Sequence, residues 1–323
     1  MRRIKVSVAY IGSGYSGFQK NTDALLPSIQ ARIEEALARY LGAGNESLGA
    51  RRFQALQISS RTDAGVHALG NVFHVDILSD SDGATGPLPH ASHLVRGLNS
   101  ILQQGREKIV ISDAIDAGPD FCARRSCTGR RYIYKVLCPS AAEKPGRQAD
   151  LTSGLSPSTA LFHRQFCHVI DTPLDVEAMQ RATLLLIGEK DFASFRNAGC
   201  QSASSFRNLT QLDVASMRCD PSVVPLVSAA SPSSSSFPST SAAVTLVTFT
   251  ISANAFLLKM VRNLVGVLLE VGEGRIDAKR VGDLLEIRDR SRLGVRPAPA
   301  NGLTLSDVFY DGAHGTKRHV ANK

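Results

Sequence analysis

The strands and helices that the sequence predicts follow one another in nearly the same order twice. Apolar residues at strand and helix spacing give the order βαββαβ before Phe121 and βαββααβ after it. Ser28 is placed to begin the first helix and Gly42 to end it. The predicted strands span 4–11, about 52–60, 71–78, 109–114, 131–137, 208–215, 243–253 and 303–310, and the predicted helices span 28–41, about 92–102, 175–187, 257–271 and 277–288.

This repeat predicts an α+β fold with two ferredoxin-like, RRM-like subdomains in tandem. Their antiparallel sheets would form a central RNA-binding cleft. The first subdomain would span 1–120 and the second 121–312, followed by a basic tail at 313–323. The stretch 220–242 is rich in Ser and Pro, and its low complexity predicts a disordered insertion in the second subdomain.

Composition narrows the class of protein. The 323 residues carry 37 Lys and Arg against 29 Asp and Glu, a net charge of +8, which favours a partner with a phosphate backbone. The six cysteines form no CxxC pair, so neither a zinc site nor a redox dithiol is expected. No apolar run approaches the roughly 18 residues of a membrane span, and we expect an intracellular protein with no cleavable presequence visible before the first strand.

The stretch SSRTDAGVHALG at 59–70 contains the best candidate for a nucleophile. In an extended strand Arg61 and Asp63 would lie on the same side, where a guanidinium can pair with a carboxylate and keep it ionised. Ala64 and Gly65 then predict a bend that presents Asp63 at a strand end. The alternative is an aspartate that only stabilises its own turn.

Other cationic and aromatic side chains offer companions for Asp63. Arg124, Arg131 and Tyr132 belong to a short span that interleaves arginines with rings, as binding of phosphates and bases requires. Core packing is the alternative for Tyr132 and for its neighbour Tyr134. In the helix at 257–271, Lys259 and Arg262 fall outside the centre of the apolar stripe, and the alternative for Arg262 is a solvated surface side chain.

Several common sites have no counterpart in the sequence. His67 and His74 lack further ligands at a workable spacing for a metal, so we predict structural or hydrogen-bonding roles for both. Neither a P-loop nor a Gly-x-Ser-x-Gly elbow is present. This leaves Asp63 as the nucleophile by elimination as well as by setting.

Six motifs in order along the chain resemble the TruA family of tRNA pseudouridine synthases. SSRTDAGVHALG is similar to the active-site signature of that family, and YIGSGYSGFQ at 10–19 is similar to its opening turn. The remaining similarities are Arg131-Tyr132, DFASFR at 191–196, NAF at 254–256 with MVRN at 260–263, and Gly302-Leu303. The resemblance runs from residue 4 to about 310.

The resemblance implies roles for individual residues. Asp63 would be the catalytic nucleophile, Arg61 its partner in handling the flipped nucleotide, Tyr132 the ring on the target uracil and Arg262 the ion-pair partner of Asp63. The implied substrate-binding residues are Tyr10, Phe18, Gln19, His67, Arg124, Arg196 and Lys259.

The resemblance further implies isomerisation of uridine to pseudouridine near the anticodon stem-loop of tRNA, by a homodimer with no metal or organic cofactor. Ile11, Lys20 and Ser60 depart from the bacterial pattern of Asp, Arg and Gly, which puts target choice in question more than chemistry. Ser60 and the Ser-rich insertion resemble the eukaryotic pseudouridylate synthase-like branch, which implies mitochondria, with cytoplasm or nucleus as alternatives. The competing hypothesis is a noncatalytic RNA-binding or chaperone protein on the same fold.

Overall fold

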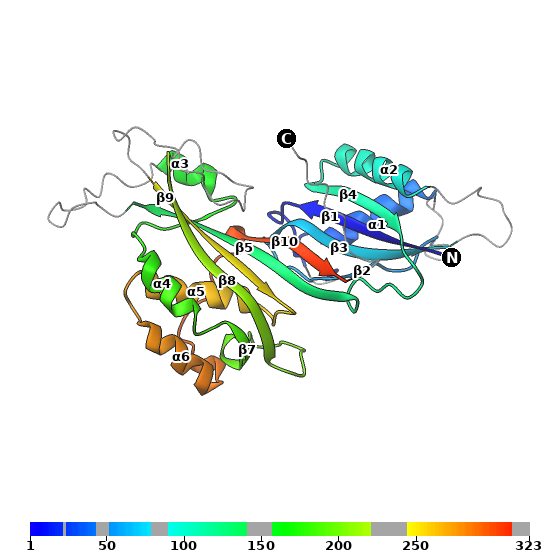
Figure 1. The fold of residues 1–323 in the computed structure, drawn as a ribbon. Coiled ribbons are helices and arrows are strands. Elements are labelled where there is room, and N and C mark those ends of the chain that lie inside the picture. Colours follow the sequence, from blue (N-terminus) through cyan, green and yellow to red (C-terminus); the bar gives the residue numbers. More distant parts are fainter. Residues whose placement is uncertain (22–23, 43–51, 79–89, 141–156, 221–243, 312–323) are drawn as a thin grey trace. The chain divides into compact units, whose positions relative to one another are not determined.

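The chain forms two compact units. The computed structural model describes residues 1–21, 24–42, 52–78, 90–140, 157–220 and 244–311 (Figure 1). The first unit is Met1–Arg130 together with Leu305–Lys323, and the second is Arg131–Thr304. The division therefore falls ten residues after the predicted boundary, and the last strand belongs to the first unit. The predicted insertion at 220–242 lies outside the described residues except for residue 220. The predicted tail at 313–323 lies wholly outside them.

The first unit contains a sheet with two helices. Its strands lie in the order β4 (Ile109–Asp116), β1 (Arg2–Tyr10), β3 (His67–Ile77) and β10 (Leu303–Tyr310), and the short strand β2 (Gln57–Ile58) also pairs with β3. β1 is antiparallel to both β3 and β4. With α1 (Ile29–Tyr40) and α2 (Ala91–Gln104), the order along the first half is βαββαβ, as the sequence predicted.

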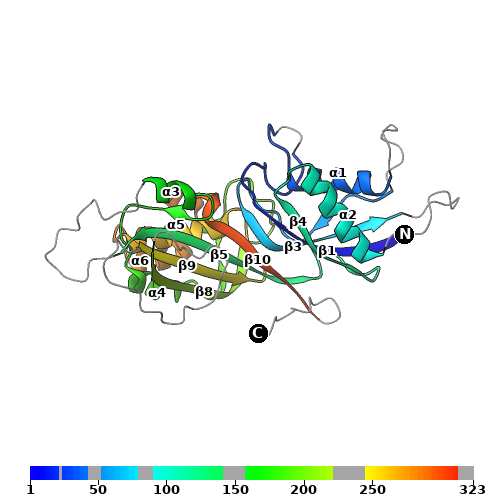
Figure 2. The same cartoon turned by 90° about the horizontal axis from the view of Figure 1, so that it is seen from above.

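Helices α1 and α2 lie side by side in the first unit (Figure 2). The Ser28 hydroxyl caps α1 by accepting a hydrogen bond from the Ala31 N–H at 3.1 Å, and Gly42 follows the helix with φ of +71°. Gly97 of α2 allows the close approach, since a Cβ there would lie 1.9 Å from the Tyr40 ring. The apolar faces of both helices are buried, as their periodicity predicted.

The second unit has a mixed sheet. Its strands lie in the order β5 (Cys127–Pro139), β9 (Val244–Ala253), β8 (Phe206–Cys219) and β7 (Gly188–Asp191), and β5 enters this unit at Arg131. β7, β8 and β9 pair antiparallel. However, β6 (His168–Val169) pairs with β5 in parallel, which corrects the expectation of a purely antiparallel sheet.

Four helices accompany this sheet in the described part of the second unit. They are α3 (Pro157–His163), α4 (Val176–Thr183), α5 (Met260–Gly272) and α6 (Ala278–Ile287). α4 packs against α5, α6 and β8 (Figure 1). α5 is buried almost all round, as is typical of a central helix. The fold class is therefore α+β, as the sequence predicted.

Candidate active site

Asp63 lies in a loop between β2 and β3. The Val66 N–H donates to the Asp63 carbonyl at 3.1 Å and closes a turn in which Gly65 has φ of +81°. Asp63 is half-buried and lies four residues before β3 begins, and the predicted bend is confirmed. This arrangement leaves part of the Asp63 side chain accessible beside a rigid sheet.

The strand that was predicted to place Arg61 beside Asp63 is not observed at these residues. Neither residue lies in a strand, because β2 is only two residues long and ends at Ile58. Strand alternation therefore does not place the two side chains together. Arg61 is exposed, and its pairing with Asp63 stays a prediction.

The opening turn at 11–20 packs directly against this loop. The Phe18 N–H donates to the Thr62 carbonyl at 3.1 Å. Two glycines permit the contact: a Cβ at Gly17 would lie 2.8 Å from the Thr62 oxygen, and a Cβ at Gly12 would lie 2.0 Å from the Val66 oxygen. Backbone on both sides of Asp63 is thus in close contact with the opening turn.

A buried polar network holds the residues just before Asp63. The Tyr10 hydroxyl lies 2.7 Å from Thr62 Oγ1 and accepts from Asn71 Nδ2 at 3.1 Å. Asn71 Nδ2 also donates to the Ser60 carbonyl at 3.0 Å. The Ser59 hydroxyl donates to Asn71 Oδ1 at 2.8 Å. Sequence reasoning missed Asn71, since a lone polar residue in an apolar strand has no characteristic spacing.

The four residues assigned to substrate binding near the loop differ in exposure. Tyr10, Phe18 and His67 are buried, whereas Gln19 is exposed. His67 accepts a hydrogen bond at Nδ1 from the Gly12 N–H at 3.1 Å, consistent with the predicted hydrogen-bonding role. The Tyr10 and Phe18 rings pack with centroids 5.9 Å apart. Contact of any of the four with RNA stays a prediction.

The segment that carries Arg124 is anchored in the first unit by Phe121 and Ala123. Phe121 packs on the ring of Tyr310 at a centroid distance of 5.3 Å, and the Ala123 carbonyl accepts from the Tyr310 hydroxyl at 2.8 Å. His74 Nδ1 accepts from the Ala123 N–H at 3.1 Å. Arg124 is exposed, as an RNA contact would need to be.

In the second unit, Tyr132 and Tyr134 lie in β5 in different surroundings. Tyr132 is 6% exposed and meets Phe256 edge-on at 5.3 Å. Tyr134 is fully buried, and its hydroxyl donates to the Pro299 carbonyl at 2.9 Å. Burial raises the pKa of the Tyr134 phenol against the opposing charge of Arg262. Tyr134 is therefore a core residue, which was the alternative for it.

Arg262 lies in the first turn of α5 and is half-buried, which excludes the alternative of a fully solvated side chain. Its Nε donates to the Ala298 carbonyl at 2.6 Å, and the Ala298 N–H donates back to the Arg262 carbonyl at 2.9 Å. A Cβ at Gly266 would lie 2.6 Å from the Arg296 oxygen, so the segment at 295–298 runs against α5. This segment fixes the stem of Arg262.

Lys259 and Arg196 lie on segments that contact one another in the second unit. Lys259 precedes α5 with φ of +56°, and Arg196 follows a 3-10 turn at Ala193–Phe195. The Asn197 N–H donates to the Leu258 carbonyl at 3.0 Å and joins the two segments. Both cations are partly exposed.

The candidate residues are thus divided between the two units. The first unit contains Asp63, Arg61, Tyr10, Phe18, Gln19, His67 and Arg124, and the second contains Tyr132, Arg196, Lys259 and Arg262. Within the first unit, the structure brings the Asp63 loop together with Tyr10, Phe18 and His67. The pairing of Asp63 with Arg262 joins the two units and stays a prediction.

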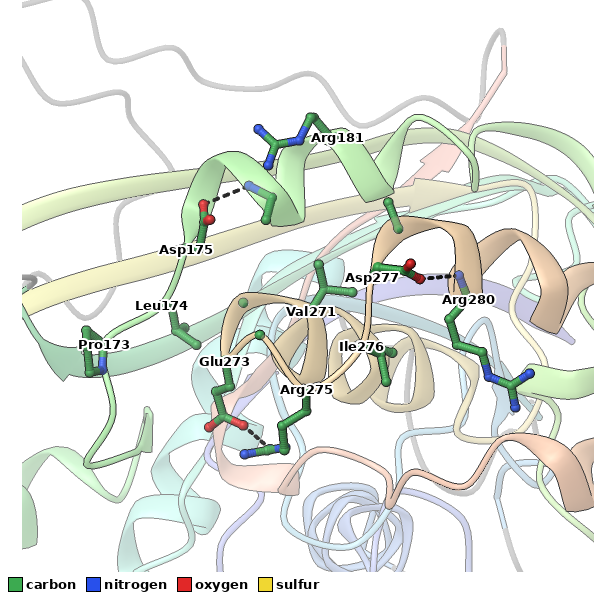
Figure 3. A pocket seen from close by; sticks show the side chains of 14 residues that line it. Pro173, Leu174, Asp175, Arg181, Val271, Glu273, Arg275, Ile276, Asp277 and Arg280 are labelled. Atoms are coloured by element: carbon green, nitrogen blue, oxygen red, sulfur yellow. Dashed lines mark hydrogen bonds and ion pairs between the residues drawn. The ribbon is translucent and has the colours of Figure 1, made fainter.

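A pocket of about 1140 Å³ in the second unit lies between α4, α5 and α6 and contains none of these residues (Figure 3). Several of its charged side chains bond to other residues of the lining. Asp175 and Asp277 cap α4 and α6, and Arg275 pairs with Glu273. Since no motif residue lines the pocket, we do not assign the reaction to it.

Neither a metal site nor a membrane span was found in the part of the chain that the structure describes. No group of three or more His, Cys, Asp or Glu side chains there could hold a metal ion. No helix among those residues is long and apolar enough to cross a bilayer. All six cysteines are free thiols.

Comparison with known proteins gives consistent matches. A family model described as tRNA pseudouridine synthase matches residues 182–311. The tRNA pseudouridine synthase A of Myxococcus xanthus is 34% identical over 310 residues, which cover 96% of this chain and 92% of the relative. The enzyme of the same name from Methylobacterium sp. is 34% identical, with 96% and 98% covered, and that from Neisseria gonorrhoeae is 33% identical, with 98% and 95% covered. The chain belongs to the TruA family of tRNA pseudouridine synthases, a family of RNA-modifying isomerases.

Proposed function

We propose that the protein converts a uridine of tRNA to pseudouridine with Asp63 as the nucleophile. The geometry of the Asp63 loop is the observation that carries this proposal. A half-buried carboxylate lies in the loop that leads into β3, and the backbone around it is in close contact with the opening turn. Catalysis requires such a fixed and accessible group, whereas binding of RNA alone does not.

The reaction exchanges one bond at the ribose for another. The bond from C1′ of the ribose to N1 of uracil breaks, the base turns within the pocket, and a bond from C1′ to C5 forms. The hydrogen at C5 leaves to water as a proton and N1 takes up a proton, so the product is an isomer of the substrate and no oxidant or reductant is consumed. An ionised carboxylate can attack covalently, and exclusion of water keeps the detached base in place.

The other candidate residues take supporting roles in this proposal. Tyr132 would pack on the target uracil, Arg262 would pair with Asp63, and Arg61 would handle the flipped nucleotide. The resemblance of the motifs supports these roles, and the half-buried position of Arg262 is compatible with an ion pair.

Finer points of the proposal rest on resemblance to the family. These are a target near the anticodon stem-loop, tandem ferredoxin-like subdomains around an RNA-binding cleft, a homodimer, membership of the eukaryotic-like branch, and location in mitochondria. Sedimentation of the purified protein tests the dimer, and imaging of the tagged protein in cells tests the location.

The first experiment uses a tRNA transcript that carries tritium at C5 of uracil. We expect the wild-type protein to release tritium into water, and Asp63→Asn and Asp63→Ala to release none while still folding and binding tRNA. Asp113→Asn, which alters an exposed carboxylate on β4 of the same unit, should release tritium at the wild-type rate. Turnover by Asp63→Ala would remove Asp63 from the mechanism, and binding without release by the wild type would favour the noncatalytic RNA-binding hypothesis.

A further inference from the structure

We propose that Asn71 is a positioning residue, which holds the Asp63 loop in the geometry that the reaction needs. This inference rests on the proposed function, since it assigns Asn71 a role in the step that Asp63 performs. Asn71 lies in β3 and is fully buried. A buried primary amide is costly unless its donors and acceptor are satisfied.

The amide of Asn71 uses its whole hydrogen-bonding capacity. Its Oδ1 accepts from the Ser59 hydroxyl at 2.8 Å and from the Val72 N–H at 2.9 Å. Its Nδ2 donates to the Tyr10 hydroxyl at 3.1 Å and to the Ser60 carbonyl at 3.0 Å. Two donated and two accepted bonds saturate the group and fix its orientation.

Two routes lead from Asn71 to Asp63. The first passes through the Ser60 carbonyl, three residues before Asp63. The second passes through the Tyr10 hydroxyl to Thr62 Oγ1 at 2.7 Å, and Thr62 is the residue next to Asp63. Asn71 therefore holds residues that precede Asp63 in the chain, and none of these bonds involves Asp63 itself.

A side chain is needed here because the loop has left the sheet. β2 ends at Ile58 and β3 begins at His67, and the last backbone bond between them joins the Ser59 N–H to the Val72 carbonyl, so the pairing stops before Ser60. Ser60 and Thr62 are nevertheless buried, and buried backbone groups need partners. Asn71 supplies one for the Ser60 carbonyl, and the opening turn supplies one for the Thr62 carbonyl through the Phe18 N–H.

Asn99 offers a matched control within the same unit. Its Nδ2 donates to the Ile111 carbonyl at 2.8 Å, and its Oδ1 accepts from the Ile111 N–H at 2.8 Å. These bonds join α2 to β4 and do not involve the Asp63 loop. Asn71→Ala and Asn99→Ala each remove side-chain bonds to backbone of the first unit, but only the first variant releases the loop.

The experiment compares both variants in three measurements: urea unfolding, tRNA binding, and the single-turnover rate of tritium release with enzyme in saturating excess. We expect Asn71→Ala to lower the rate at least about ten-fold, because misplacement of a reacting group by about 1 Å can cost 10²-fold. Its Kd for tRNA should stay within about two-fold of the wild-type value, as should the rate of Asn99→Ala. A wild-type rate for folded Asn71→Ala, or an equal loss of rate in Asn99→Ala, would overturn the proposal.

Tyr10→Phe carries the test if Asn71→Ala does not fold. This variant keeps the ring and removes only the hydroxyl between Asn71 and Thr62, and we expect a single-turnover rate lowered at least about three-fold with tRNA saturated by enzyme. An unchanged rate contradicts the role of Asn71. Failure of the proposed function is a separate result, in which the wild-type protein itself releases no tritium, and the positioning role then falls with it.

Discussion

His74 is a buried histidine whose surroundings oppose a positive charge. Burial lowers its pKa below the usual 6.5, as do the charges of Arg3 and Arg125, whereas Asp76 acts in the opposite direction. The Ala123 N–H donates to Nδ1, so this nitrogen must carry no proton in the folded protein. His74 is therefore neutral in the native state at neutral pH.

A neutral buried histidine makes stability depend on pH. The unfolded chain takes up the proton at higher pH than the native state does, so the free energy of unfolding falls as the pH drops below about 6.5. The contribution of one such group is bounded by about 1.4 kcal/mol per pH unit. The variant His74→Asn can keep an acceptor for the Ala123 N–H. We expect it to reduce the slope of the free energy of unfolding against pH, measured by urea unfolding between pH 7.5 and 5.

The exposed His93 provides the control for this pH experiment. His93→Asn should leave the slope unchanged. Some slope should remain in His74→Asn, because burial also lowers the pKa of His168 in the second unit. Equal slopes in His74→Asn and the wild type would show that protonation of His74 does not limit stability.

At the scale of elements, the opening turn shows what close packing around the Asp63 loop requires. Gly14 and Gly17 have φ of +95° and +109°, values that strain any residue with a Cβ. A Cβ at Gly14 would meet nothing within 4 Å, whereas one at Gly17 would lie 2.8 Å from the Thr62 oxygen. A side chain would strain the backbone at both positions, but only at Gly17 would it also collide with Thr62.

Alanine at the two positions should separate these effects. We expect Gly14→Ala to cost about 1 kcal/mol of unfolding free energy from backbone strain. Gly17→Ala should cost about 1–3 kcal/mol more, because the turn must move away from Thr62. Urea unfolding of both variants measures the difference. Equal losses of unfolding free energy would show that the turn moves away from Thr62 at no cost in stability.

The longer elements could be predicted from sequence because their periodicity reflects burial of one face. α1, α2, α5 and the strands β1, β8, β9 and β10 all lie close to their predicted ranges. In place of the predicted strand at 52–60, the structure has only the two-residue strand β2 and an isolated bridge at Phe53. The short strands β6 and β7 depend on pairing with β5 and β8, so local periodicity does not show them.

The same distinction applies to the candidate site. The bend after Asp63 could be predicted, because Ala64 and Gly65 are local signals of a turn. The role of Asn71 could not, since its partners Tyr10 and Ser59 lie 61 and 12 residues away. The strand alternation predicted for Arg61 and Asp63 was wrong, because β2 ends at Ile58.

At the scale of the whole molecule, the first unit is built from both ends of the chain. β10 lies next to β3 in its sheet, although the whole second unit separates them in sequence. Tyr310 of β10 packs on Phe121, its ring lies 4.5 Å from the Lys5 ammonium, and its hydroxyl bonds to the Ala123 carbonyl. Burial raises the pKa of the Tyr310 phenol, which keeps this hydroxyl a donor.

This arrangement predicts that Tyr310 stabilises the first unit, although it lies far in sequence from Met1–Arg130 of that unit. We expect Tyr310→Ala to cost about 3–5 kcal/mol of stability, and Tyr310→Phe about 1 kcal/mol for the lost hydroxyl. Native-state hydrogen exchange should show reduced protection in β1 and β3 and unchanged protection in β8 and β9. Loss of protection confined to β8 and β9 would contradict the placement of β10 in the first unit.

The position of β10 also has a consequence for synthesis on the ribosome. Domains tend to fold in order as the chain emerges, and the second unit can fold while most of β10 is still being made. The first unit cannot, because part of the β3 edge stays unpaired until the final strand arrives. A chain that stops early exposes this edge, which invites aggregation, so the nascent protein acquires its complete Asp63 scaffold only after β10 has been made.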